Sequence, residues 1–96
     1  MNNQQSLFSV RVGRVEFVLK ALKAYTYYSK LSKECSTDAD KCIYDRELKN
    51  IYREYSLKAF DLSERVTNII NMVNISSDEF VTVTEDIYKL IYKCES

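Results

Sequence analysis

Apolar positions in the middle of the chain repeat with the spacing of a packed helix. Between residues 44 and 73, successive apolar positions lie three or four residues apart. This a/d spacing predicts a long helix, because a strand alternates every second residue and a loop shows no period. Thr37 is suited to an N-cap and Asn74 to a helix end, so we expect the helix to span about residues 38–73. The apolar stripe consists of Tyr44, Leu48, Tyr52, Tyr55, Ala59, Leu62, Val66, Ile69 and Val73.

The C-terminal segment carries start signals for another helix. Ser76 and Glu79 have the spacing of a capping box, and Ile75 and Phe80 flank them as a hydrophobic staple. The stretch "FVTV" alone resembles a strand, but the start signals favour a helix over about residues 77–94. Its apolar positions follow at steps of three and four residues: Phe80, Val83, Ile87, Leu90 and Cys94.

The N-terminal stretch "FSVRVGRVEFVLKAL", residues 8–22, fits two interpretations. Apolar residues alternate on both sides of Gly13, as in two strands joined by a Gly-Arg turn. Helical spacing instead predicts one helix over about residues 7–33. An isolated hairpin is marginally stable and no third strand is apparent, whereas one glycine costs a helix only about 1 kcal/mol. We therefore expect the helix, with a first apolar seam of Phe8, Val12, Val15, Leu19 and Leu22.

The same helix has a second apolar seam on nearly its opposite side, because each residue turns the helix by 100°. A helix with two apolar seams contacts two neighbours. The sequence therefore predicts an all-α fold: an antiparallel three-helix bundle with a long central helix. We expect one domain covering residues 1–96, with residues 1–6 disordered. The second seam consists of Phe17, Ala21, Ala24, Tyr28 and Leu31.

The predicted third helix is half as long as the second, so it cannot cover both longer helices. The half of the pair near the turn should expose apolar side chains, and such surfaces usually mark binding sites. We therefore expect a protein-protein interaction module, completed by a second copy in a homodimer and binding a further protein as an adaptor, regulator or stoichiometric inhibitor. The predicted partner-binding residues are Phe17, Ala21, Ala24, Tyr28, Tyr44 and Leu48.

Charge is unevenly distributed although the net charge is zero. Residues 1–33 contain six basic side chains and one acidic one, whereas residues 75–96 contain five acidic and two basic side chains. Packing of these two segments against each other is electrostatically favourable. The basic segment also interleaves lysines with tyrosines, which suit phosphate contacts and base stacking. Nucleic-acid binding is therefore the alternative function, through Lys20, Lys23, Tyr27 and Lys30.

No residue pattern indicates catalysis or a bound metal. The chain has no histidine, which removes the commonest general base and the commonest metal ligand. Three aspartates near residues 38–45 faintly resemble a calcium loop, but the loop glycine is missing and Lys49 replaces the bidentate glutamate. We therefore expect no enzyme activity, no cofactor and no metal site.

Cysteine usage and hydropathy indicate a cytoplasmic protein. Three cysteines cannot form a complete disulfide framework, so we expect reduced thiols, with Cys35 and Cys42 able to pair only under oxidation. No apolar run is long enough to span a membrane, and no signal-peptide pattern is present. The composition, rich in Lys, Ile, Tyr and Asn, is typical of small proteins from AT-rich genomes, such as those of viruses and mobile elements.

Overall fold

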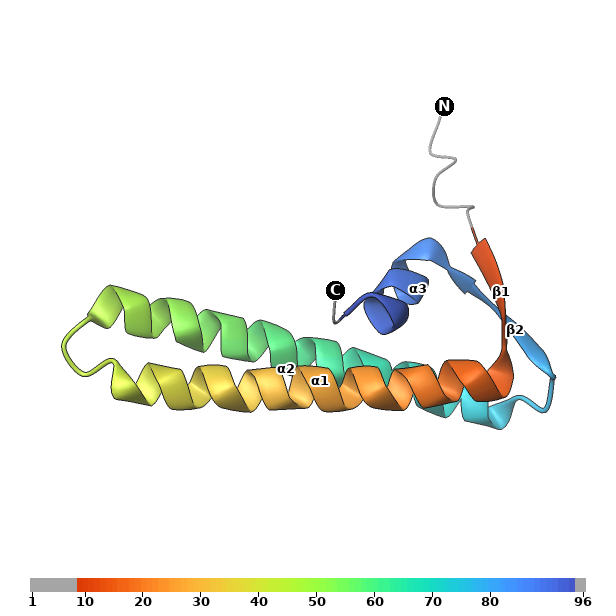
Figure 1. Cartoon of the computed structure of the whole chain (residues 1–96), viewed down its shortest axis with the longest axis horizontal. Coiled ribbons are helices and arrows are strands. Elements are labelled where there is room, and N and C mark those ends of the chain that lie inside the picture. Colours follow the sequence, from red (N-terminus) through yellow and green to blue (C-terminus); the bar gives the residue numbers. More distant parts are fainter. Residues whose placement is uncertain (1–8, 95–96) are drawn as a thin grey trace, which may run out of the picture.

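The computed structural model describes residues 9–94, so the expected disorder of residues 1–6 lies outside the described residues. This part of the chain is mostly helical, with two long helices packed together, a short third helix and a two-stranded antiparallel sheet. Figure 1 shows α3 and the sheet at the end of the long pair where α1 begins. In chain order the elements are β1 (Ser9–Gly13), α1 (Arg14–Lys41), α2 (Arg46–Ile75), β2 (Phe80–Thr84) and α3 (Glu85–Tyr92).

Small side chains let α1 and α2 approach each other closely. Ala21 of α1 is fully buried and Ala59 of α2 is nearly so. Near the middle of the pair, Ser32 Oγ donates to the Ser56 carbonyl over 2.9 Å, and Ser56 Oγ donates to the Ser32 carbonyl over 2.9 Å. These reciprocal bonds join the two helices directly.

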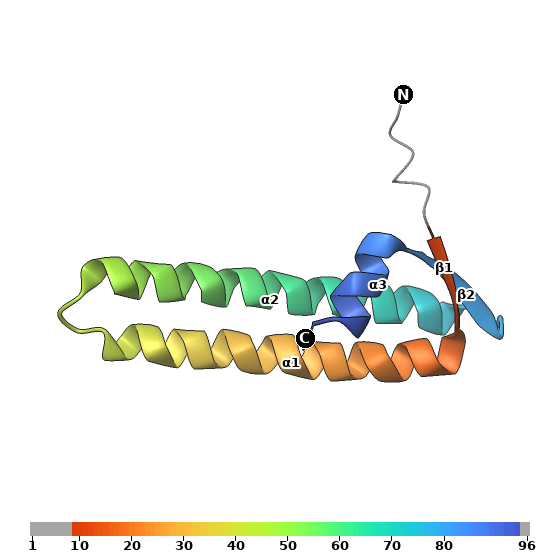
Figure 2. The same cartoon turned by 45° about the horizontal axis from the view of Figure 1, so that its top comes forward.

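The core lies at the end of the pair that α3 and the sheet cover (Figure 2). Phe17 of α1 and Val66 of α2 are its largest fully buried side chains, and Ile91 of α3 packs with them. The Tyr28 hydroxyl donates to the Leu90 carbonyl over 2.9 Å, which ties α1 to α3. The prediction of two long packed helices and a shorter third one is confirmed.

The expected helix over residues 7–33 is wrong at its start, because residues 9–13 form β1. The partner strand is β2, with Ser9 opposite Thr84 and Gly13 opposite Phe80. A two-stranded sheet is marginal alone, but this one packs its valines against helices and so gains the burial it needs. The inward-facing valines are Val10, Val12, Val81 and Val83.

The expected helix over residues 77–94 is also wrong in its first half, which is β2. Ser76 Oγ accepts a hydrogen bond from the Asp78 amide in the turn after α2 instead of capping a new helix. The N-cap of α3 is Thr84, whose Oγ1 accepts from the Ile87 amide over 3.3 Å. The alternating β-branched residues of "FVTVT" form a strand and not a helix, because β1 is available as the pairing partner.

The turn between α1 and α2 lies later in the chain than expected. Thr37 lies inside α1, and α2 begins after Asp45, whose carboxylate accepts from the Leu48 amide over 3.0 Å. The α1 helix continues because Cys35 and Ala39 extend its buried side by two further turns, with Ala39 almost fully buried. Packing against α2 therefore outweighs the capping signal of Thr37.

Candidate interaction surface

The apolar stripe of α2 is covered along one half and exposed along the other. In the C-terminal half, Leu62, Ile69 and Val73 pack against the core formed with the sheet and α3. In the N-terminal half, Leu48 and Tyr55 are 39% and 57% exposed. We call the exposed apolar group the distal surface; it consists of Ile43, Tyr44, Leu48, Ile51 and Tyr55.

The α2 members of the distal surface lie on one side of the helix. Leu48, Ile51 and Tyr55 are separated by three and four residues, which places them within one stripe. Lys58 lies beside this stripe, with its Nζ 5.7 Å from the centroid of the Tyr55 ring. The stripe thus combines aliphatic and aromatic area, a composition typical of the centre of protein interfaces.

The turn between α1 and α2 continues the distal surface to the tip of the molecule. Ile43 and Tyr44 occupy this turn, and Tyr44 is 98% exposed. The chain is held there by the Cys42 amide, which donates to the Ala39 carbonyl over 3.1 Å, and by the Asp45 cap of α2. Turn positions are usually polar, so two large apolar side chains at an ordered turn indicate a contact surface.

The predicted partner-binding residues divide between this surface and the core. Tyr44 and Leu48 are exposed, as expected. The other four present no surface to a partner in this structure, because they are buried where α1 meets α2 and α3. Their regular spacing therefore reflects packing within the chain. These four are Phe17, Ala21, Ala24 and Tyr28.

The expected first apolar seam shows the reverse arrangement within α1, whereas its Val12 lies in β1 and packs against the core, and its Phe8 lies outside the described residues. Val15, Leu19 and Leu22 are exposed on the side of α1 away from its buried residues. Both seams have the same period, so periodicity alone does not tell which of them is buried. The alanines of the second seam are the useful signal, since small side chains permit close helix contact.

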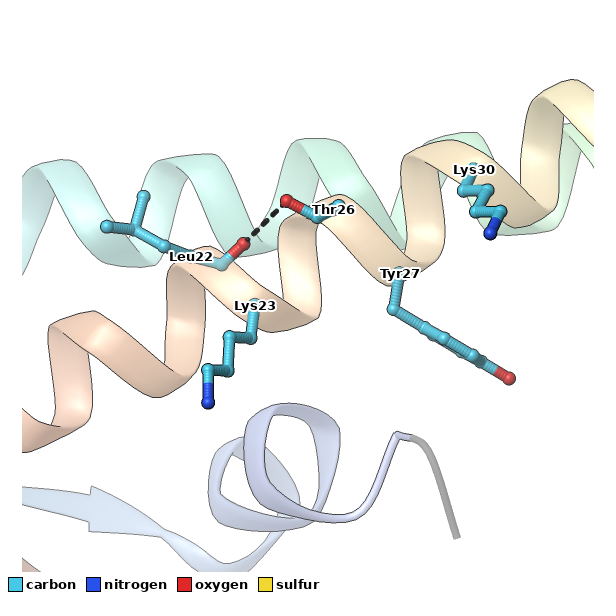
Figure 3. A pocket seen from close by; sticks show the side chains of 5 residues that line it. All are labelled: Leu22, Lys23, Thr26, Tyr27 and Lys30. Carbon is cyan, nitrogen blue, oxygen red and sulfur yellow. Dashed lines mark hydrogen bonds between the residues drawn. The ribbon is translucent and has the colours of Figure 1, made fainter.

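The residues predicted for nucleic-acid contact lie on α1 around a shallow depression of about 450 Å3 (Figure 3). Lys23, Tyr27 and Lys30 line it, and Lys20 lies one turn before with its Nζ 6.0 Å from the Tyr92 ring centroid. Tyr27 is half-buried and its ring meets the Tyr28 ring edge-on, with centroids 5.4 Å apart. The lysines are thus available for anion contacts, but the tyrosine ring is already packed.

Two tyrosines between α1 and α3 have raised pKa values. Burial raises the pKa of Tyr28 to about 12, with Cys94 and Tyr27 adding to the effect. Burial also raises the pKa of Tyr92, whose ring stacks on Tyr88 with centroids 4.4 Å apart. Both phenols are therefore neutral near pH 7, and the neutral Tyr28 hydroxyl is the donor in the hydrogen bond to the Leu90 carbonyl.

In the part of the chain that the structure describes, the residues that could bind a metal ion are not grouped together. Within residues 9–94, no three cysteine, aspartate or glutamate side chains are grouped so that they could hold a metal ion. Cys35, Cys42 and Cys94 are not joined by disulfides, and Cys42 Sγ donates to the Asp38 carbonyl over 3.3 Å. None of the described helices is both long and apolar enough to cross a membrane.

Comparisons with known proteins give no relative from which a function could be transferred. No family model matches the chain, and no curated protein or solved structure is significantly similar to it. The surfaces described above are therefore the basis for the function proposed below.

Proposed function

We propose that this protein is a small helical interaction module that associates with a second copy of itself through the distal surface. The observation that supports the proposal is the continuous apolar stripe of α2, which α3 and the sheet cover at one end only. In an antiparallel homodimer, the long helices of each copy would cover the exposed half of the other. This arrangement is a four-helix contact of the kind that amphipathic helices commonly form.

A dimer formed in this way leaves the outer faces of the molecule free for another protein. Exposed apolar side chains remain on α1 at Val15, Leu19 and Leu22 and on α2 at Leu57 and Phe60. Action as an adaptor, regulator or stoichiometric inhibitor in a reducing, cytoplasmic setting belongs to the same proposal. It requires only binding, and no chemical step.

Molar mass measured by light scattering over a concentration series tests self-association. We expect a dimer for the wild type, and we expect the double variant Leu48→Glu/Ile51→Glu to be a monomer. Burying two unpaired carboxylates in the interface should weaken association by about 100-fold or more. Leu57→Glu is the matched control, because Leu57 is an exposed leucine of α2 outside the distal surface.

Two outcomes would contradict the proposal. The first is a monomeric wild type over the whole concentration series. The second is an equal loss of mass in the control and in the double variant. Circular dichroism of each variant shows whether helicity is retained, which it should be because the substituted side chains are exposed.

Nucleic-acid binding by Lys20, Lys23 and Lys30 is the alternative function. The observation in its favour is that these lysines have no ion pair within residues 9–94. The packed ring of Tyr27 weakens it, because a base needs a free aromatic face for stacking. A gel shift at low salt that disappears as salt rises would support this alternative.

A further inference from the structure

The backbone of β2 has an open hydrogen-bonding edge. Beyond the paired residues Gly13 and Phe80, the Arg14 amide donates to the Glu79 carbonyl over 2.9 Å. Hydrogen-bonded and non-hydrogen-bonded pairs alternate in an antiparallel ladder, so the Gly13–Phe80 pair is a non-hydrogen-bonded one. The N–H and C=O groups of Phe80 and Thr82 therefore point away from β1. Phe80 and Thr82 alone therefore place two backbone donors and two acceptors at the free edge of β2.

This edge borders a groove of about 470 Å3 between β2 and the C-terminal part of α2. All five residues of β2 line the groove, from Phe80 to Thr84. Ile69, Met72 and Val73 of α2 line its other side, and Met72 is 72% exposed. The groove thus offers backbone groups along one wall and apolar side chains along the other, which is what an added strand requires.

Acidic residues stand at both ends of β2. Asp78 and Glu79 precede the strand, and Glu85 and Asp86 follow it. Glu85 pairs with Lys89 over 3.5 Å, whereas Asp78, Glu79 and Asp86 have no ion pair within residues 9–94. Arg14 Nε donates to the Asp78 carbonyl over 2.8 Å, so each pair of acidic residues has one cation beside it, and an added strand would meet a net negative charge at each end.

The same charges disfavour a second copy at this edge. If β2 of another copy paired antiparallel with β2, residues 78–79 of one chain would lie near residues 85–86 of the other. Like charges facing each other across an interface are destabilising. A basic segment in extended conformation matches both the charge and the hydrogen-bonding pattern.

We propose that the groove beside β2 binds an extended, basic peptide segment, with alternating apolar side chains, as a third strand of the sheet. The bound segment donates to and accepts from the free backbone groups of Phe80 and Thr82. Its apolar side chains contact Met72 and the neighbouring residues of α2, and its basic ends lie near Asp78 and Asp86. This site is separate from the distal surface, so it does not depend on self-association.

Fluorescence anisotropy with a labelled synthetic peptide tests the proposal on the full chain. The probe alternates valine and threonine and carries a lysine at each end; a second probe carries glutamates at the ends instead. The test variant is Thr82→Pro, which removes a free-edge N–H while leaving the ladder bonds to β1 intact. The control is Ser9→Pro, because Ser9 lies on the outer edge of β1 by the same alternation.

We expect saturable binding of the lysine probe to the wild type and to Ser9→Pro. Thr82→Pro should weaken this binding by about tenfold or more, since it removes at least one main-chain hydrogen bond and blocks close approach of the strand. The glutamate probe should bind at least about tenfold more weakly than the lysine probe.

Each of the following results would overturn the proposal. One is the absence of saturable binding of the lysine probe to the wild type. Another is equal affinity for the two probes, or equal affinity of Thr82→Pro and the wild type. The last is a concentration-dependent rise in molar mass that Thr82→Pro alone abolishes, because a second copy would then occupy the edge. Circular dichroism and thermal unfolding test whether both proline variants are folded.

Discussion

Gly13 stands at the junction of β1 and α1, and its conformation is one that other residues adopt readily. Its φ of −66° and ψ of 135° are ordinary extended values. A Cβ placed on it would meet nothing within 4 Å. Gly13 is the N-cap of α1, yet it has no side chain with which to accept a hydrogen bond from the first turn. The single glycine of the chain therefore leaves a stabilising interaction unused.

Gly13→Ser should stabilise the fold by about 0.5–1 kcal/mol. The serine hydroxyl can accept from an amide in the first turn of α1, and the substitution also reduces the freedom of the unfolded chain. Urea unfolding followed by circular dichroism measures the change. Gly13→Ala lacks the hydroxyl and should gain less; equal effects of the two substitutions would refute the capping argument.

Tyr28 makes stability depend on alkaline pH. Its pKa rises from 10.0 to about 12 on folding, so the folded chain holds this proton more tightly than the unfolded chain. The stabilisation is complete below pH 10 and is lost as pH rises towards 12. Unfolding free energies measured between pH 9 and about 12 should fall less steeply for Tyr28→Phe than for the wild type. Parallel curves would contradict this assignment.

At the scale of the elements, local signals predicted most of α2 but misplaced every boundary that depends on distant contacts. The stripe around Ala59 and Val66 is long enough to identify a helix from its period alone. Thr37 and Ser76 are good caps in isolation, yet Thr37 lies within α1 and Ser76 ends α2. Whether each of these residues caps a helix depends on how the neighbouring segments pack, and the spacing of residues along the sequence does not contain this information.

The two strands show the same limit more strongly. Val10, Val12, Val81 and Val83 can be recognised as a sheet only when residues about 70 positions apart are paired. Each segment by itself also satisfies a helical period, so the choice between helix and strand depends on the partner. Tyr44 and Leu48 of the distal surface could be predicted from the sequence. The groove beside β2 could not be predicted, because it exists only once the sheet has formed.

A proline scan of β2 distinguishes its two edges. Val81 lies opposite Val12 in a pair that exchanges ladder hydrogen bonds, so Val81→Pro removes a bond and should destabilise the fold by about 3 kcal/mol. Thr82→Pro should cost about 1 kcal/mol or less, because its amide points to the free edge. Thermal unfolding of both variants measures the difference, and equal losses would show that the assigned alternation is wrong.

At the scale of the whole molecule, the chain is elongated, with principal extents of 52 × 35 × 21 Å. The short helix α3 and the sheet lie at one end, and the turn between α1 and α2, which contains the exposed Tyr44, lies at the other end (Figure 1). The described parts of the basic and acidic segments, residues 9–33 and 75–94, lie against each other, since β1 pairs with β2 and α1 packs on α3, and this is the adjacency that their charges favour. One contact between them is the hydrogen bond that Arg14 Nε donates to the Asp78 carbonyl over 2.8 Å.

The pairing of β1 with β2 also has a consequence for the order of folding. The contacts between α1 and α2 are close in sequence around the turn, so the helical pair can form early. The sheet has to wait until residues 80–84 have been synthesised and have reached residues 9–13. Until then Leu62, Ile69 and Val73 lack their cover, and the nascent chain exposes one long apolar face. The chain is therefore most prone to aggregate before β2 and α3 have been synthesised and have covered these side chains.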